Sequence, residues 1–356
     1  MQQFDPDMLI KTCLDRVPLR DGEAQFLFSP AFDPFRPTLY KEADRVRHEM
    51  VGDDVFLRGL IEFSNYCSCR CHYCGISALN TEIDRYRMSR EEVVETLAAG
   101  YEMGFRSFVL QSGEDRTWRE KDVVALITSL KERFDAAITL SIGEWPRSSL
   151  EAFRAAGADR YLLRIETSDP ELFAKFHPDS RWEDRHRCLM DLKELGFQVG
   201  SGILVGLPGQ DGVSLGRDLR YLLSLEPEMV GIGPFIPHPK TPLADAKGGT
   251  LDECLTFLAL LRMYMPDSFL PATTAMGSIA PDGRKRALEA GANVLMPNVS
   301  PTENRARYQL YPGKICLNDD ALKCRRCVEG WVTDMGRKTN LGHGHIHRKV
   351  FSPPVL

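Results

Sequence analysis

Eight short apolar segments, each followed by an amphipathic or turn-forming stretch, constrain the fold of this 356-residue chain more than any other feature. They span residues 55–63, 107–111, 137–142, 160–164, 198–205, 229–233, 270–274 and 293–296. Alternating strands and helices predict a parallel sheet, and eight such units predict a closed (β/α)8 barrel of the TIM type. A doubly wound open sheet is the alternative architecture.

The barrel leaves room for a segment on either side, because a (β/α)8 barrel alone uses roughly 250 residues. Residues 1–54 are predicted to form an N-terminal helical cap, with an apolar stripe through Met8, Leu9, Cys13 and Val17 and a second helix near residues 40–50. Residues 55–300 are predicted to form the barrel. Residues 301–356 are predicted to form a cysteine-containing extension that packs on the barrel.

Charge and composition exclude some classes of partner. The net charge of −5 and the pI near 6.0 argue against nucleic acid or an anionic membrane as the main partner. The first residues have neither a basic start nor an apolar core, and no apolar run approaches 18 residues, so we expect a cytoplasmic protein. Most of the ten cysteines are clustered, which in such a protein favours metal binding over disulfides.

A loop after the first predicted strand carries Cys67, Cys71 and Cys74 at C-x3-C-x2-C spacing. Three thiolates on one loop can ligate three irons of a [4Fe–4S] cubane and leave the fourth open to a non-protein ligand. Structural zinc prefers four closed ligands, so this trio is a poor zinc site. Cys69 offers other spacings, and we expect it not to be a ligand.

This loop resembles that of the radical S-adenosylmethionine (SAM) enzymes, in which the open iron of a [4Fe–4S] cluster is chelated by the amine and carboxylate of SAM. Tyr73 stands at the position of the family's aromatic residue before the third cysteine. The resemblance implies that the chain generates a 5′-deoxyadenosyl radical from SAM.

The resemblance also implies residues that bind SAM. Glu114, next to Gly113 after the second strand, is expected to meet the methionyl ammonium, with Ser141 at the end of the third strand also contributing. Glu166 is expected to accept the ribose hydroxyls and Arg185 to pair with the methionyl carboxylate. The alternatives are an exposed acid for Glu114, a salt bridge to Arg164 or Arg160 for Glu166, and a surface arginine for Arg185.

Loop sequences narrow the resemblance further, to the [FeFe]-hydrogenase maturases of the HydE type. The matching strings are SGED, SIGEWP, DRYLLR, VGLPGQ, VGIGPFIPHP, PATTAMG and YQLYPGKIC, and the likeness as a whole extends over residues 56–327. Biotin synthase and methylornithine synthase resemble the chain in fold and cluster loop but lack these strings.

The resemblance to the maturases implies a cavity inside the barrel of this chain that binds a carboxylate-bearing ligand. In the maturases the ligand is an organometallic iron complex. The residues that resemble the lining of that cavity are Arg58, Thr139, Arg160, Thr273, Thr274, Tyr308 and Tyr311. A buried cation inside an apolar strand, such as Arg58, needs an anionic partner, which a carboxylate would supply. The threonines could instead be ordinary strand residues, and the tyrosines could pack in the core.

A second trio, Cys316, Cys324 and Cys327, resembles the accessory Fe–S site of the maturases, often a [2Fe–2S] cluster. Zinc or an empty reduced site are the alternatives. Cys13, Cys188 and Cys254 lie in helical patterns and are expected to be buried apolar residues. The histidines of residues 342–347 could bind a metal, although a solvated tail is the simpler interpretation.

One position departs from the family pattern. Maturases carry a histidine immediately before the glutamate after the fourth strand, where this chain has Ile165. An isoleucine cannot donate or accept a hydrogen bond, so we expect the cavity to be more apolar there and the substrate to differ.

The sequence therefore predicts a radical SAM enzyme that acts on a small carboxylate-bearing or organometallic substrate in hydrogenase-cofactor assembly. The resemblance implies an electron donor such as flavodoxin or ferredoxin and contact with other hydrogenase maturases. A methylornithine synthase or biotin synthase activity is the rival enzyme function. A non-catalytic Fe–S scaffold is the rival class, and it would need the cysteines but not Glu114, Glu166 or Arg185.

Overall fold

The N-terminal part is helical, as predicted. The structure, a computed structural model, describes residues 4–318 and 320–346. The cap consists of α1 (Pro6–Leu14), α2 (Asp21–Leu27), the 3₁₀ helix η1 (Pro30–Phe35) and α3 (Arg36–Val51). The expected apolar stripe is partly wrong. Leu9 and Cys13 are buried, but Met8 and Val17 are 60% and 51% exposed, and Ile10 takes the inward position.

Parallel strands form the centre of the molecule. The six-stranded sheet has the order β2 (Gly59–Ser64), β3 (Ser107–Ser112), β4 (Ala137–Ser141), β5 (Arg160–Leu162), β6 (Gln198–Ser201) and β8 (Met229–Val230). Its register places Val109 of β3 opposite both Leu60 and Thr139. The order follows the sequence, so each strand of this sheet pairs with the next sheet strand along the chain, and only β7 (Leu204–Val205) between β6 and β8 is left out.

The remaining pairings run from β8 back to the first strand. Met229 forms a parallel bridge with Phe269, and Pro271 with Val294 of β10 (Val294–Leu295). In turn, β10 pairs with β1 (Asp54–Leu57), which Arg58 separates from β2. The seventh predicted strand is reduced to these bridges, because α11 (Thr274–Ile279) begins within it. The predicted α/β barrel architecture is confirmed.

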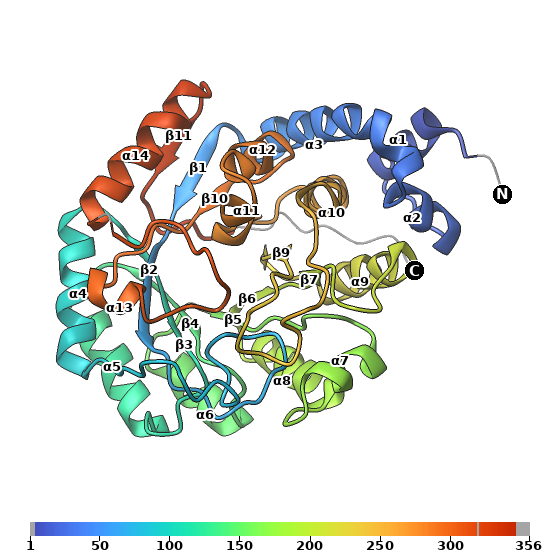
Figure 1. Cartoon of the computed structure of the whole chain (residues 1–356). Coiled ribbons are helices and arrows are strands. Elements are labelled where there is room, and N and C mark those ends of the chain that lie inside the picture. Colours follow the sequence, from blue (N-terminus) through green and yellow to red (C-terminus); the bar gives the residue numbers. More distant parts are fainter. Residues whose placement is uncertain (1–3, 319, 347–356) are drawn as a thin grey trace.

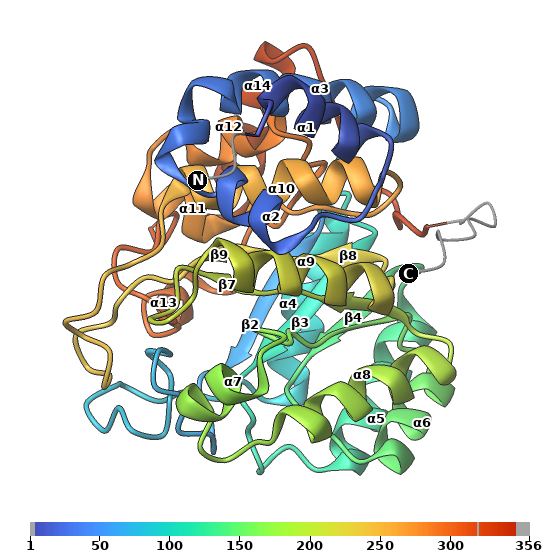
Figure 2. The same cartoon turned by 90° about the vertical axis from the view of Figure 1, so that its right-hand side faces the viewer.

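Helices surround these strands (Figure 1 and Figure 2). They are α4 (Arg90–Glu102), α5 (Glu120–Arg133), α6 (Arg147–Ala155), α7 (Pro170–Phe176), α8 (Trp182–Glu194), α9 (Gly212–Leu225), α10 (Leu251–Tyr264) and α12 (Gly283–Glu289). The start of α4 shows how the sequence sets a boundary. Ser89 Oγ accepts from the Glu92 amide at 3.2 Å, and the Glu92 carboxylate accepts from the Ser89 amide at 2.6 Å. No helix among the described residues is both long and apolar enough to cross a membrane.

The predicted strand over residues 198–205 is broken into β6 and β7 (Leu204–Val205), and β7 pairs with β9 (Gly233–Pro234). Gly202 stands at the break. A Cβ on Gly202 would lie 1.7 Å from the Gly231 carbonyl oxygen, so only glycine allows the two chains to approach this closely. The break separates the barrel wall from the loops above it.

The C-terminal extension joins the barrel through an additional strand. It contains α13 (Thr302–Arg305), α14 (Ala321–Asp334) and β11 (Lys338–Asn340), and β11 pairs in parallel with β1. Figure 1 shows α14 beside β11. The sequence pattern did not predict β11.

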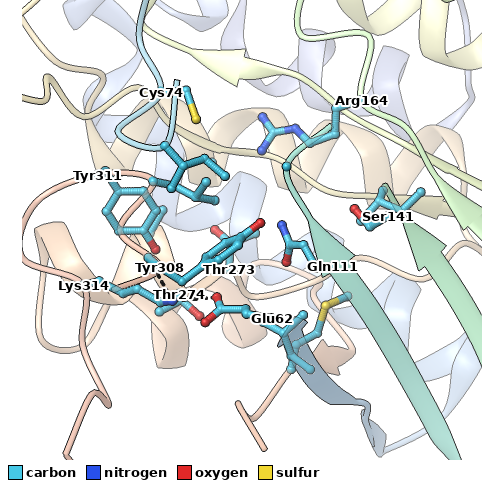
Figure 3. Close-up of a pocket in the computed structure, with 18 of the residues that line it drawn as sticks. Glu62, Cys74, Gln111, Ser141, Arg164, Thr273, Thr274, Tyr308, Tyr311 and Lys314 are labelled. Atoms are coloured by element: carbon cyan, nitrogen blue, oxygen red, sulfur yellow. Dashed lines mark hydrogen bonds and ion pairs between the residues drawn. The ribbon is translucent and has the colours of Figure 1, made fainter. Parts of the chain in front are cut away.

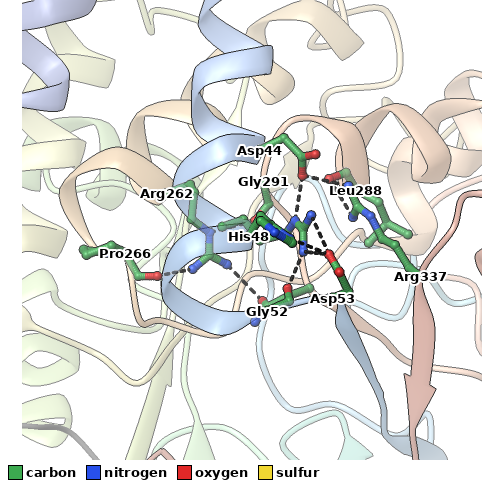
Figure 4. Close-up of polar contacts among 11 residues, drawn as sticks. Asp44, His48, Gly52, Asp53, Arg262, Pro266, Leu288, Gly291 and Arg337 are labelled. Atoms are coloured by element: carbon green, nitrogen blue, oxygen red, sulfur yellow. Dashed lines mark hydrogen bonds and ion pairs between the residues drawn. The ribbon is translucent and has the colours of Figure 1, made fainter.

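Buried arginines connect the cap, the barrel and the extension (Figure 4). Asp44 of α3 accepts from Arg47 at 2.6 Å and from Arg337, just before β11, at 2.7 Å. Arg262 of α10 donates to the Gly291 carbonyl at 2.8 Å and to Asn293 at 3.1 Å. Because each guanidinium meets main-chain or side-chain oxygens, these buried charges are compensated.

Candidate functional site

A cavity of about 380 Å³ opens where the strands of the barrel end (Figure 3). Residues from the cluster loop, the strand ends and the C-terminal extension line it together. The predicted site residues in its lining are Cys67, Cys71, Tyr73, Cys74, Gly113, Glu114, Ser141, Glu166, Arg185, Thr273, Thr274, Tyr308, Tyr311, Cys316 and Cys324. Cys69 lines it as well. The tertiary structure therefore brings 15 of the predicted site residues to one space.

Main-chain hydrogen bonds hold the cluster loop against the end of β3. The Ser68 amide donates to the Glu114 carbonyl at 3.0 Å, and the Gly113 amide donates to the Ser64 carbonyl at 3.1 Å. A Cβ on Gly113 would lie 2.3 Å from the Tyr66 carbonyl oxygen. Gly113 thus allows close contact with the cluster loop itself, which gives it a structural role beside the expected one toward SAM.

The four loop thiols differ in acidity. The Cys69 thiol donates to Cys67, which lowers the pKa of Cys67 to about 7 and raises that of Cys69. Burial raises the pKa of Cys74 to about 12 and also raises that of Cys71, with the neighbouring thiolates adding to the effect. Proximity of three thiolates is therefore unfavourable without a cationic metal centre to compensate them.

The donor set fits a [4Fe–4S] cluster better than a single ion. Among the described residues no three Cys, His, Asp or Glu side chains converge as ligands of one metal ion. A cubane instead needs three thiolates that each reach a different iron. Cys67, Cys71 and Cys74 are unbridged and line one cavity, so all three are available to such a cluster.

Glu114 is placed by its neighbours instead of pointing freely into solvent. Its carboxylate accepts from the Glu144 amide at 3.1 Å and pairs with Arg116 at 2.9 Å. Its side chain is 12% exposed, which excludes the alternative of an ordinary exposed loop acid. Gly143 has φ of +81°, and a Cβ there would overlap the Glu114 side chain at 2.1 Å. The loop after β4 therefore makes room for this carboxylate.

Glu166 occupies a strained position at the end of β5. Its φ is +67°, which is rare for glutamate, and the Glu166 amide and carbonyl bond to Gly202 and Leu204. The carboxylate lines the cavity and pairs with Arg164 at 2.9 Å. The salt bridge offered as an alternative is present, and it leaves the carboxylate in the cavity wall.

Arg185 is buried, so the surface-arginine alternative is wrong. Its guanidinium pairs with Glu144 and donates to the Arg164 carbonyl at 2.7 Å. Burial lowers the pKa of Arg185, but the Glu144 carboxylate outweighs it, and the net shift is upward. Glu144 was not predicted as a site residue, although its position just after a strand end was a signal for it.

Tyr73 reaches a histidine that the sequence did not single out. The Tyr73 hydroxyl and His177 Nε2 lie 2.8 Å apart, and His177 stacks on Phe173 with ring centroids 4.0 Å apart. Burial, reinforced by Arg185, lowers the pKa of His177 to about 3, so the imidazole is neutral. His177 thereby fixes the aromatic ring that precedes Cys74.

A second unpredicted group forms the opposite wall. Glu62 of β2 accepts from Lys314 at 2.6 Å and from Asn298 at 2.6 Å, and Lys314 also donates to the Tyr308 carbonyl at 2.9 Å. Figure 3 shows Glu62 and Lys314 reaching toward one another beside Tyr308 and Thr274. Glu62 interrupts an apolar strand, as Arg58 does, so the same sequence signal could have identified it.

Three predicted substrate residues lie elsewhere, which corrects the expectation of one shared cavity. Arg58, Thr139 and Arg160 line a separate space of about 10 Å³ at the N-terminal ends of the strands. That volume holds about one water molecule. Arg58 contacts Met229 Sδ at 3.2 Å and lies 4.6 Å from the centre of the Phe269 ring. Sequence position along a strand did not reveal which end of the barrel each residue faces.

The described part of the histidine-containing tail is half-buried against the barrel, which corrects the simpler expectation of a solvated tail. Arg160 donates to the carbonyls of His343 and Gly344, both at 2.6 Å, and the two imidazoles of His343 and His345 stack. A Cβ on Gly344 would lie 2.9 Å from Phe56, so this segment packs tightly against the base of the barrel. His347 lies outside the described residues.

Ile165 is fully buried in the hydrophobic core and is not among the cavity-lining residues. The expectation that it makes the cavity more apolar is therefore wrong. The neighbouring residues Arg164 and Glu166 both line the cavity, whereas Ile165 between them points into the core. Alternation along an extended segment explains the difference.

The accessory cysteines lie at the far end of the same cavity. Cys316 and Cys324 line it, and Arg284 approaches Cys316 Sγ at 3.9 Å. Cys327 is exposed, and the three sulfurs do not converge on one ion. Cys13, Cys188 and Cys254 are buried, as predicted.

Known proteins share this architecture over most of the chain. The sequence profile of the Radical SAM superfamily matches residues 61–222. The [FeFe] hydrogenase maturase subunit HydE of Thermotoga maritima is 49% identical over 89% of this chain and 90% of its own length. The 3-methylornithine synthase of Methanosarcina acetivorans is 33% identical over 86% of this chain and 88% of its own.

Among solved structures, methylornithine synthase (PylB) superposes with a TM-score of 0.81 at 29% identity, covering 93% of this chain and 97% of the other. The cluster loop, the cavity and these similarities agree. The chain therefore belongs to the radical SAM superfamily and, within it, to the family of the HydE maturase subunit.

Proposed function

We propose that this protein is a radical SAM enzyme of [FeFe]-hydrogenase active-site assembly, acting on a small carboxylate-bearing or organometallic substrate inside the barrel. The observation that carries the proposal is one cavity that joins the cluster cysteines to the predicted SAM residues and to four of the predicted substrate residues. The 49% identity to a HydE subunit, over nine-tenths of both chains, supports the biological role.

When bound, the cluster and SAM supply the electron and the 5′-deoxyadenosyl radical. The chain's own residues bind and orient SAM and the substrate. Arg185 would meet the methionyl carboxylate, which would compete with Glu144 for its guanidinium. Glu114 and Glu166 each have a carboxylate in the cavity wall for ammonium or hydroxyl groups, while Ser141 adds a hydroxyl beside them. Thr273, Thr274, Tyr308 and Tyr311 surround the space left for substrate.

The proposal includes partners and location. An electron donor such as flavodoxin or ferredoxin would reduce the cluster, and other hydrogenase maturases would receive or supply the substrate. We propose a cytoplasmic enzyme with no nucleic-acid or membrane partner, supported by its ten unbridged cysteines and acidic net charge. An accessory [2Fe–2S] cluster at Cys316, Cys324 and Cys327 is part of the same proposal.

The decisive experiment is cell-free activation of [FeFe]-hydrogenase apoprotein with the other maturases, with and without this protein. We expect hydrogen evolution only when the protein and SAM are both present, together with formation of 5′-deoxyadenosine. The Cys71→Ala variant is the matched control. Production of 5′-deoxyadenosine without hydrogenase activation would contradict the biological role but retain the radical chemistry.

A methylornithine synthase activity is the second candidate, because the fold and 33% identity over most of the chain favour it. Its test is the appearance of 3-methylornithine in the same reaction. A non-catalytic scaffold is distinguished by the absence of 5′-deoxyadenosine.

A further inference from the structure

Four cationic side chains line the main cavity, and they differ in their partners. Arg164 pairs with Glu166 at 2.9 Å, Arg185 pairs with Glu144, and Lys314 pairs with Glu62 at 2.6 Å. Arg284 lies in the first turn of α12. It has no carboxylate partner among the described residues. Its contacts are Cys316 Sγ at 3.9 Å and the Trp331 ring, whose centre lies 5.7 Å from the guanidinium carbon.

We propose that Arg284 is the residue that recognises the carboxylate of the substrate. The inference rests on the proposed function and deepens it by assigning one residue to the anionic group. Arginine remains protonated in proteins, and its planar fork matches a carboxylate with two parallel hydrogen bonds. A ligand carboxylate that binds Arg164, Arg185 or Lys314 must displace an internal carboxylate, whereas one that binds Arg284 displaces none among the described residues.

The guanidinium is held in place before any ligand arrives. A Cβ on Gly277 of α11 would lie 3.2 Å from Arg284 Nε and 2.8 Å from Ile315 Cδ1. Glycine at 277 therefore leaves the space through which the arginine side chain passes. With Trp331 on another side, the side chain loses little conformational freedom when a ligand binds, which favours recognition.

A second polar group that lines the cavity lacks a hydrogen-bond partner among the described residues. Thr273 Oγ1 is buried and makes no hydrogen bond among the described residues, although it lines the cavity. A buried hydroxyl without a partner costs free energy that a ligand can recover. A substrate carboxylate on Arg284 and a second polar atom at Thr273 would satisfy both groups.

The competing explanation is that Arg284 serves Cys316 and compensates a thiolate of the accessory site. The 3.9 Å contact permits it. The two explanations predict different effects of replacing Arg284. A substrate-binding arginine selects carboxylates from solution, whereas a cysteine partner affects iron retention at the accessory site.

The radical reaction itself reports which small molecules enter the cavity. The holoenzyme would be reduced with dithionite in the presence of SAM and one of three probes that carry deuterium on carbon: propionate, alanine or propylamine. A probe bound near the radical donates a deuterium atom, which forms mono-deuterated 5′-deoxyadenosine and a carbon radical on the probe. Mass spectrometry gives the deuterated fraction of the 5′-deoxyadenosine, a ratio that is independent of the total rate.

We expect saturable deuterium transfer from propionate and alanine but not from propylamine. In Arg284→Met the half-saturating probe concentration should rise at least tenfold, and Arg284→Lys should recover part of that loss. The matched control is Arg286→Met on the same helix, where the arginine instead pairs with Asp252 at the surface. This control should stay within twofold of the wild type.

Three results would overturn the assignment: equal half-saturation in Arg284→Met and the wild type, equal transfer from propylamine, or a Cys316→Ala variant that reproduces the loss seen in Arg284→Met. Wild-type 5′-deoxyadenosine without deuterium from either carboxylate would overturn the inference and leave radical generation intact. Absence of 5′-deoxyadenosine from the wild type would overturn the proposed function as well.

Discussion

The two ends of the barrel compensate buried arginines in different ways. At the mouth, Arg164 and Arg185 pair with the carboxylates of Glu166 and Glu144. At the base, Arg160 donates to main-chain carbonyls of the C-terminal tail, and Arg58 contacts a methionine sulfur and an aromatic ring. Neither base arginine has a carboxylate partner among the described residues.

The acidities of the guanidinium groups follow this difference. Although burial lowers the pKa of Arg185, Glu144 raises it overall, whereas burial lowers the pKa of Arg160 to about 10 against a weak effect of Asp159. A carboxylate partner can be exchanged for the carboxylate of a ligand, whereas main-chain carbonyls fix a segment of the chain. The mouth is therefore suited to binding and the base to closing the barrel.

The largest expected effect lies at the mouth. Cys71→Ala should abolish the EPR signal of the reduced catalytic cluster and all 5′-deoxyadenosine formation, because two thiolates do not retain a cubane. Cys69→Ala is the matched control on the same loop, and its iron content should stay close to that of the wild type. Activity in a Cys71→Ala protein would refute the assigned ligand set.

The next prediction tests whether the carboxylate of SAM can replace that of Glu144 at Arg185. Arg185→Met leaves the Glu144 carboxylate with the Ser180 hydroxyl but no counterion, so we expect a fall in unfolding free energy of about 3 kcal/mol and at least a tenfold weaker affinity for SAM. The double variant Glu144→Gln/Arg185→Met should recover stability but not SAM affinity. Calorimetry of SAM binding and thermal unfolding measure the two quantities. If the double variant binds SAM as the wild type does, Arg185 has no role in SAM binding.

At the base, Arg160→Met should affect stability first. It leaves the His343 and Gly344 carbonyls without their donor, which costs about 1–3 kcal/mol for each carbonyl that stays buried. Thermal unfolding and limited proteolysis of the tail measure the effect. Arg154→Met on α6 removes an arginine that donates to the Ala158 carbonyl and should change the melting temperature much less. An unchanged melting temperature in Arg160→Met would show that the tail does not depend on this contact.

The smallest expected effect concerns the accessory cysteines. Replacing Cys316, Cys324 and Cys327 together should lower the iron content but reduce 5′-deoxyadenosine formation by less than tenfold, a barrier change of about 1.4 kcal/mol or less. Iron analysis and product quantification on the folded protein test this. Complete loss of product would mean that the far end of the cavity participates in radical generation.

The contrast between the two ends also shows what a sequence pattern can reveal. Cys67, Cys71, Cys74, Glu114 and Glu166 were identifiable because they follow predicted strands, and the carboxyl ends of parallel strands meet at one end of a barrel. Arg58 and Arg160 were assigned to the same cavity by resemblance to the maturases, and for Arg58 also because a buried cation suggests a ligand. The hydrogen-bond partners of Arg160 come instead from residues 343 and 344, which no periodicity connects to residue 160.

Local alternation has a similar limit. Ile165 departs from the family pattern, yet its effect on the cavity depends on whether its own side chain points into the cavity or into the core. The left-handed conformation of Glu166 and the main-chain contacts with Gly202 and Leu204 set that direction. Such contacts join segments more than 35 residues apart, so the sequence around residue 165 does not contain them.

By itself, the sequence determined the alternation of strands and helices and the resemblance to the radical SAM enzymes, and it predicted the cluster ligands, because these depend on short-range periodicity and on cysteine spacing within one loop. Only the tertiary structure decided the Arg185–Glu144 and Lys314–Glu62 pairs, the unmatched charge of Arg284 and the tail that closes the barrel base. The physical reason is that a charge acquires its role from its partner, and these partners lie far apart in the chain.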